Sequence, residues 1–207
     1  MSFMGDVKSK FFETTVAAGV AVIAVAARPT TTFTLTTGAG SAAGMGTNIG
    51  RKITATTTGT GDVGKTVALV GIGVDGEALE ESITLLGTAA TTAGTTNYFV
   101  SVTTATVNTQ PAANVSLGIL TATAGQVFAG PTRVRQANIY SGGAIGSVDF
   151  RSGSTSGTSL LTVRTNATLG NSTTVNIPQD GVYFTVGGTF ITFDETDCNA
   201  VTVYYDG

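Results

Sequence analysis

The sequence predicts an all-β protein, and three features of the chain support this fold class. Thr is the most frequent residue, and Gly supplies 28 of the 207 residues, about double its usual share of roughly 7%. Charged residues make up only 11% of the chain, against roughly 25% in typical globular proteins. Short runs alternate apolar and polar residues between Gly, Asn and Thr turns. Because β-branched side chains fit a pleated sheet and lose rotamer freedom in a helix, these features favour strands.

Two groups of predicted strands indicate two antiparallel β-sandwich domains, of the Ig-like or jelly-roll-like kind. Domain 1 covers residues 30–120, with strands expected at 31–37, 51–58, 66–73, 80–86, 98–107 and 114–119. Domain 2 covers residues 133–207, with strands expected at 133–140, 146–151, 159–164, 173–178, 182–186, 189–194 and 200–205. Residues 121–132 are mostly small and include Pro131, so we expect a linker there. One continuous sandwich is the alternative.

Residues 1–29 are expected to form an N-terminal arm, helical or extended, that packs on a neighbouring subunit. Its apolar run at residues 16–27 is about 12 residues long, well short of the roughly 20 that span a bilayer. A secretory signal is the alternative, since the segment also has basic residues and an A-x-A sequence, but Asp6 and Glu13 interrupt its basic region. An apolar arm needs a partner surface, which predicts a homo-oligomer.

Charge and residue usage argue against several classes of function. The net charge is −3 and the ten Lys and Arg residues are scattered, so no basic patch indicates nucleic acid as a partner. The chain has no His, which removes an imidazole base, and Cys198 is its one Cys, which disfavours a zinc site. A lone Cys forms no intrachain disulfide and leaves the compartment open. We predict no catalytic residue, cofactor, metal or membrane partner.

The stretch GTGDVGKT at residues 59–66 matches the P-loop pattern G-x-x-x-x-G-K-[ST] through Gly59, Gly64, Lys65 and Thr66. A true P-loop follows a buried parallel strand and opens a helix whose N-terminus holds phosphate. Here the stretch lies between two alternating segments, and glycines in the second one disfavour a helix by about 1 kcal/mol each. We therefore interpret it as a turn that joins two antiparallel strands, with Lys65 as a solvated charge at a strand edge. A P-loop nucleoside triphosphatase (NTPase) is the weaker alternative.

Three further clusters of polar residues could bind ions. Two of them are carboxylate trios: Glu77, Glu80 and Glu81, and Asp194, Glu195 and Asp197. Carboxylate oxygens are calcium ligands, but neither trio has the D-x-D-x-D-G spacing, so we expect solvated charges that keep edge strands apart. The third cluster is the loop RSGSTSGTS at residues 151–159, which is either a phosphate-binding nest or a hairpin tip, and the hairpin is favoured.

Motifs in the first half of the chain resemble a module of tailed-bacteriophage structural proteins. In that module a G-x-D-x-x-G hairpin is followed by E-x-I-T, by Y-F at the start of a long strand, and by N-V-x-L-G. The corresponding residues here are G-V-D-G at 73–76, E-S-I-T at 81–84, Y-F at 98–99 and N-V-S-L-G at 114–118. The chain departs from the module at Glu77, where a small residue is usual, and this departure affects surface charge only.

The second half resembles another small phage virion module. It carries I-Y-x-G and G-S-V-x-F-R-x-G within 139–153, L-x-V-x-T at 161–165, I-P-x-x-G-V-x-F at 177–184 and V-T-V-Y-Y at 201–205. Together the two resemblances cover most of the chain after Arg51. They imply a repeated, non-enzymatic virion component, assembled in the cytoplasm of the host bacterium.

The resemblance implies, first, a capsid decoration (cement) protein that binds the shell of the major capsid protein and stabilises it. A neck or tail component, such as an adaptor, tube or fibre subunit, is the second expectation, and the number of copies per virion separates the two. A bacterial surface adhesin built from Ig-like modules is the third, and cleavage after Ala26 would favour it. The expected partners are copies of the chain itself and the major capsid protein or other virion proteins.

Overall fold

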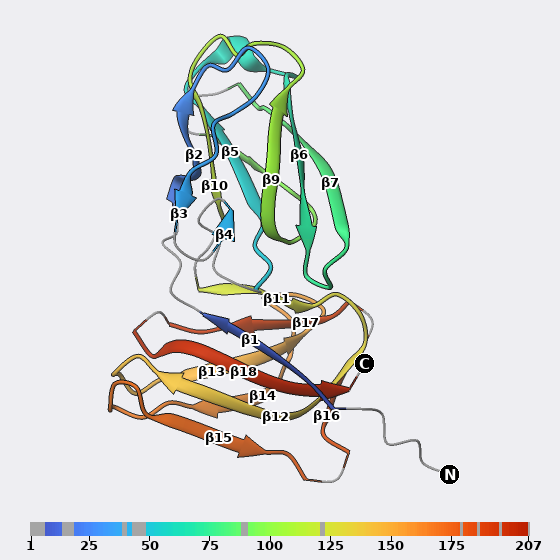
Figure 1. Cartoon of the computed structure of the whole chain (residues 1–207), viewed down its shortest axis with the longest axis vertical. Helices are drawn as coiled ribbons and strands as arrows, with labels where there is room; N and C mark the ends of the chain where they lie inside the picture. The colour runs from blue at the N-terminus through green and yellow to red at the C-terminus, as the bar shows by residue number, and fades with distance from the viewer. Residues whose placement is uncertain are drawn as a thin grey trace. The chain divides into compact units, whose positions relative to one another are not determined.

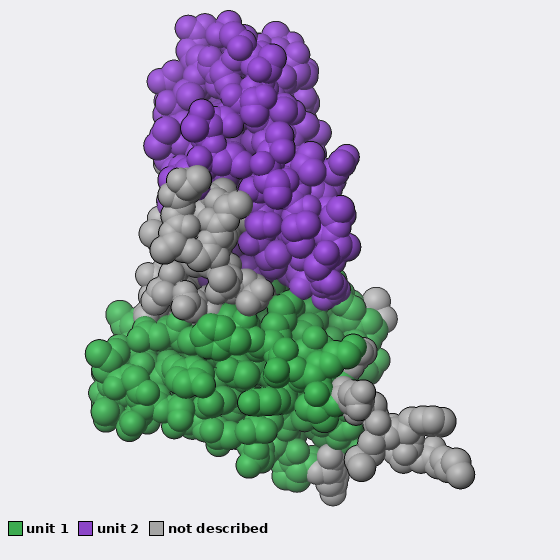
Figure 2. Space-filling view, viewed as in Figure 1, with its two compact units in different colours: residues 1–15, 123–207 green, residues 16–122 purple. Residues whose placement is uncertain are grey.

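The computed structural model describes residues 7–13, 19–38, 41–42, 49–87, 91–120, 123–178, 180–185, 187–194 and 196–206. Over these residues the chain is all-β and is built from antiparallel sheets (Figure 1). They include no α-helix, only one turn of 3-10 helix, η1 (Thr60–Asp62). No helix in this part of the chain has the length and apolar character to cross a membrane. The chain divides into two compact units, coloured separately in Figure 2: residues 1–15 with 123–207 form unit 1, and residues 16–122 form unit 2.

Unit 2 contains two larger sheets and one short strand pair. The four-stranded sheet has the order β2 (Gly19–Ala27), β10 (Val115–Ile119), β5 (Ile53–Thr57) and β8 (Thr91–Gly94). The three-stranded sheet has the order β7 (Ala78–Thr84), β6 (Thr66–Gly73) and β9 (Phe99–Val107). The short pair is β3 (Thr37–Gly38) with β4 (Ser41–Ala42). The hairpin expected at Asp75 and Gly76 is confirmed, since β6 pairs with β7 and Gly76 has a φ of 86°.

One hydrophobic core joins the two larger sheets of unit 2. Ile53 and Leu117 contribute to it from the four-stranded sheet, and Leu69 and Phe99 from the three-stranded sheet. None of these four side chains is more than 1% exposed. Since burying a side chain of this size stabilises the fold by about 1.5–3 kcal/mol, the core holds the two sheets together.

The strand expected at residues 31–37 does not form as one ladder. Thr32 makes an isolated bridge with Thr106, and the Phe33 amide donates to the Ala105 carbonyl at 2.9 Å, both on β9. The Thr36 amide instead donates to the carbonyl of Ile23 on β2, at 2.7 Å. The segment therefore passes from an edge of one sheet to a strand of the other, and its extended residues are shared between two partners.

Unit 1 contains the remaining strands in two sheets. The first has the order β1 (Lys8–Glu13), β18 (Cys198–Asp206), β12 (Thr132–Ser141) and β15 (Ser172–Asn176), and β16 (Val182–Phe184) also pairs with β12. The second has the order β11 (Ala124–Phe128), β17 (Thr189–Thr192), β13 (Ser147–Ser152) and β14 (Ser159–Arg164). All pairings in both sheets are antiparallel.

The N-terminal residues that the structure describes do not form a separate arm. Strand β1 pairs with β18 in unit 1, where the Phe12 side chain is wholly buried, and β2 pairs with β10 in unit 2, where Ile23 is wholly buried. The expected arm over residues 1–29 was therefore wrong, because each apolar stretch packs into a sheet of its own chain. Residues 1–6 and 14–18 lie outside the described residues.

The linker expected at residues 121–132 contains strand β11. This strand pairs with β17, and its Val127 and Phe128 side chains are buried. The small residues Ala124 and Gly125, which suggested a linker, lie in this strand at the edge of its sheet, and both are buried. Unit 1 accordingly resumes at residue 123 rather than at 133.

Candidate functional site

The P-loop-like loop at residues 59–66 connects strands of two different sheets. Strand β5 pairs with β10 and β8, whereas β6 pairs with β7 and β9. The interpretation of these residues as a turn between paired strands was therefore wrong. The loop lies at the end of unit 2 where β9 ends and β10 begins (top of Figure 1). It contains η1, and strand β6 follows it directly from Thr66.

Asp62 is the centre of this loop, and its side chain is fully buried. Its Oδ2 accepts hydrogen bonds from Thr57 Oγ1 at 2.9 Å and from the Ala113 amide at 3.1 Å. Its Oδ1 accepts from Lys65 Nζ at 2.9 Å and from the Ala112 amide. Burial raises the pKa of the Asp62 carboxyl, but the four hydrogen bonds outweigh this effect and lower the pKa to about 2. The ionised carboxylate therefore fastens the β5–β6 loop to the β9–β10 loop.

Lys65 belongs to the same network. Its Nζ donates to Asp62 Oδ1 and to the Gln110 carbonyl, each at 2.9 Å, and its side chain is 21% exposed. The expectation of a solvated charge at a strand edge was therefore wrong. In a P-loop the lysine reaches the terminal phosphates, whereas here two of its three donors bind protein oxygens.

Backbone groups of the loop are also bound within the protein. The amides of Gly64, Lys65 and Thr66 donate to the Leu85 carbonyl at 3.1 Å, to the Asp62 carbonyl at 3.1 Å and to Asn108 Oδ1 at 2.9 Å, respectively. Phosphate binding by a P-loop depends on such amides. These three are engaged by acceptors of the chain itself.

The glycines of the motif meet steric demands of the loop. Gly64 has a φ of 78°, in the left-handed region that glycine adopts most readily. A Cβ on Gly59 would lie 2.4 Å from the Cβ of Ala113, closer than real side chains approach. Gly64 is thus explained by its backbone conformation, and Gly59 by the close packing of the loop on the β9–β10 connection.

The first carboxylate trio serves two separate turns. The two oxygens of Glu81 accept the amides of Thr96 and Asn97, the latter at 3.0 Å, which ties β7 to the β8–β9 turn. Glu77 Oε2 accepts the Asp75 amide at 3.1 Å inside the β6–β7 hairpin. Glu80 is exposed on β7. Two of the three predicted charges are thus hydrogen-bonded to backbone rather than simply solvated.

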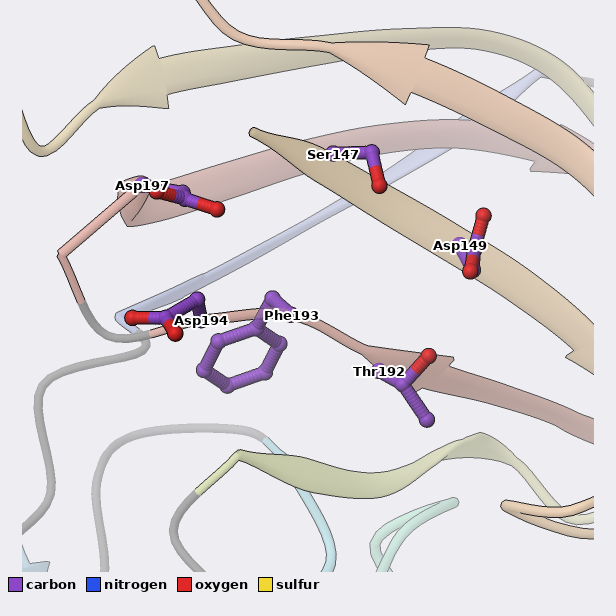
Figure 3. A pocket seen from close by; sticks show the side chains of 6 residues that line it. All are labelled: Ser147, Asp149, Thr192, Phe193, Asp194 and Asp197. Atoms are coloured by element: carbon purple, nitrogen blue, oxygen red, sulfur yellow. The ribbon is translucent and has the colours of Figure 1, made fainter. Parts of the chain in front are cut away.

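Two members of the second trio, Asp194 and Asp197, line an open hollow of about 280 Å³ in unit 1 (Figure 3). Asp194 Oδ1 accepts the Thr196 amide at 2.9 Å and the Thr196 hydroxyl at 2.8 Å, and these bonds lower the pKa of Asp194. Glu195 lies outside the described residues. Among the residues that are described, no group of three or more His, Cys, Asp or Glu side chains could hold a metal ion. The residues lining the hollow are Ser147, Asp149, Thr192, Phe193, Asp194 and Asp197.

The loop RSGSTSGTS connects β13 to β14, and these two strands pair, so the predicted hairpin is confirmed. Three of its amides are bound to backbone carbonyls: Ser152 donates to Thr158, Gly157 to Ser154 and Gly153 to Gly188, each at 3.0 Å. These three amides shape the hairpin and its neighbourhood, so they are not open to a phosphate.

The fold and these networks define an all-β chain whose motif residues hold its loops in place. Comparisons with protein-family models, with curated proteins and with solved structures find no match for the chain. The sequence drew attention to the glycines and Lys65 of the β5–β6 loop, and it missed Asp62, on which the hydrogen bonds converge.

Proposed function

We propose that this chain is a non-enzymatic structural protein of a tailed-bacteriophage virion, and specifically a capsid decoration protein. In this role it binds the outer face of the shell built from the major capsid protein and adds buried interface to it. The observation that carries the proposal is the resemblance of two groups of motifs, within residues 73–118 and 139–205, to phage virion modules.

Two features of the fold support this proposal. Two of the motifs lie at a turn and at a strand start: Gly76 has a positive φ in the β6–β7 hairpin, and the N-V-S-L-G motif leads into β10, whose five residues are all buried. The side chains best suited to chemistry, Asp62, Lys65 and Glu81, are engaged in fastening loops. Both features fit a rigid component that acts through its surface.

We further propose that each unit is an antiparallel β-sandwich. In unit 2 the two larger sheets share one core. In unit 1, Ile139 and Val201 of the first sheet and Phe150 and Ile191 of the second are at most 1% exposed. Burial of one face of every sheet is what packing of two sheets face to face requires.

The proposal is tested by the stability of the particle. A protein that binds the assembled shell and not its free subunits stabilises the shell by mass action. Particles assembled without this chain should therefore release their DNA at a lower temperature than complete particles, and adding back the purified chain should restore the higher temperature. Equal release temperatures in all three samples would overturn the role as a decoration protein.

A further inference from the structure

Two loops at one end of unit 1 expose large aliphatic side chains. Ile145 lies in the β12–β13 loop (residues 142–146) and is 71% exposed, and Leu169 lies in the β14–β15 loop (residues 165–171) and is 69% exposed. Both loops lie at the end of the unit where β12 ends and β15 begins (Figure 1). A Cβ on Gly143 would lie 3.5 Å from the Cβ of Leu169, so Leu169 packs beside the loop that carries Ile145. We call these two loops the loop end of unit 1.

Buried hydroxyl groups hold the loop end in one conformation. Ser141 Oγ donates to the Asn166 carbonyl and accepts the Gly143 amide at 3.1 Å. Thr165 Oγ1 accepts the Gly146 amide at 2.8 Å and donates to the Ala144 carbonyl at 3.0 Å. Ser141 is 1% exposed and Thr165 is 6% exposed. Since each hydroxyl joins the two loops, the loop backbone is preorganised and loses little entropy on binding a partner.

Carboxylates border this apolar surface on one side. Neither loop contains a charged residue, but the Asp197 side chain lies directly against Gly146, and the Gly142 amide donates to the Asp197 carbonyl at 3.0 Å. Asp194 and Asp197 line the hollow that begins next to the loop, at Ser147 (Figure 3). Within the described part of the chain, neither carboxylate has an ion-pair partner. The surface therefore combines exposed aliphatic side chains with uncompensated negative charge.

We propose that the loop end of unit 1 docks on a protein surface that has an apolar recess bordered by Lys or Arg side chains. The recess receives Ile145 and Leu169, and the basic side chains face Asp194 and Asp197. Charge complementarity selects this partner, since a carboxylate brought next to an apolar contact needs an opposite charge. The inference rests on the proposed function, in which the partner surface is the outer face of the assembled shell.

The β5–β6 loop of unit 2 and the residues that follow β7 provide a control surface for this test. This surface also exposes aliphatic side chains, with Val63 at 69% and Leu86 at 48%. Gly64, next to Val63, donates to the carbonyl of Leu85, next to Leu86, so the two side chains belong to neighbouring segments. The charges of its β5–β6 loop, Asp62 and Lys65, pair with each other. This surface thus has similar apolar exposure without the uncompensated carboxylates.

The test measures binding of the full chain to particles that lack it, by co-sedimentation over a range of chain concentrations. The double variant Ile145→Ser/Leu169→Ser should weaken binding by at least about tenfold, because anchor side chains dominate interface energies. The variant Asp194→Asn/Asp197→Asn should weaken binding and reduce its dependence on salt. The control Val63→Ser/Leu86→Ser should bind within about twofold of the unchanged chain.

The outcomes separate this inference from the proposed function. The substituted aliphatic side chains are about half exposed or more, so the two aliphatic variants should melt close to the temperature of the unchanged chain. If the unchanged chain and the Ile145→Ser/Leu169→Ser variant bind equally, the docking surface is wrong while the decoration role stands. If the unchanged chain does not bind the particles at all, the proposed function fails and the docking surface fails with it.

Discussion

The Asp62 carboxylate is fully buried, yet it remains ionised because four groups donate hydrogen bonds to it. Removing a carboxylate from water costs several kcal/mol unless hydrogen bonds and an opposite charge compensate it. Here the Lys65 ammonium, two amides and the Thr57 hydroxyl supply this compensation. The network should therefore depend on the charge of Asp62 itself.

The stability of unit 2 should fall as acid protonates Asp62. The pKa of its carboxyl is about 2 in the folded chain against the ordinary value of 3.8, so between these values the unfolded chain binds more protons than the folded one. The stabilisation is complete above about pH 5 and is lost progressively as the pH falls through 2; the difference in pKa corresponds to about 2 kcal/mol. Urea unfolding followed by circular dichroism at a series of pH values measures this loss.

The variant Asp62→Asn supplies the control for this pH dependence. Because it leaves Lys65 without its carboxylate, it should lower the free energy of unfolding at neutral pH by about 3 kcal/mol. Its free energy of unfolding should also fall less in acid than that of the unchanged chain, because the Asn side chain cannot be protonated in this range. Glu80→Gln removes an exposed carboxylate and should keep the original profile. An Asp62→Asn chain with unchanged stability and an unchanged profile would contradict this role.

The sequence indicated where this loop lies but not what Asp62 does. Gly59 and Gly64 are visible as turn residues because glycine has distinctive backbone freedom. The amides of Ala112 and Ala113 lie 50 and 51 residues away from Asp62 in the chain. A backbone amide carries no residue-specific signal, so these two donors could not be found from the pattern.

Strands β6 and β14 have the predicted bounds, 66–73 and 159–164. In β6 the predicted alternation is matched by alternating burial along the strand. Strands β2, β8 and β11 were missed, because their Ala, Gly and Thr residues provide little contrast between an apolar and a polar face. Alternation also cannot identify the neighbouring strand, which is why β5 and β6, adjacent in sequence, were wrongly expected to pair.

Strand β1 should contribute to the stability of unit 1 mainly through Phe12. This side chain is wholly buried, whereas the adjacent Phe11 is 45% exposed and makes an edge contact with Tyr140. Phe12→Ala should lower the free energy of unfolding of unit 1 by about 3–5 kcal/mol, and Phe11→Ala by about 1 kcal/mol. Hydrogen exchange read by mass spectrometry assigns the loss to unit 1. Equal effects of the two substitutions would show that β1 does not pack as described.

One unit of the chain is inserted into the sequence of the other. Unit 2 is inserted between β1 and β11 of unit 1, and β1 pairs with the last strand, β18, with Lys8 opposite Tyr205. The first sheet of unit 1 is therefore completed only when the C-terminal residues are available. The sequence predicted β structure on both sides of residue 121. It could not predict the insertion, because the pairing of the first strand with the last one produces no pattern among neighbouring residues.

Counting the chain in purified infectious particles is the most direct test of a role as a capsid decoration protein. Quantitative mass spectrometry gives the ratio of this chain to the major capsid protein in particles freed of host lysate. Decoration of the whole shell predicts hundreds of copies, in a fixed ratio to the major capsid protein. A few rings of copies per particle would place the chain in the neck or tail, and absence from purified particles would contradict a virion role altogether.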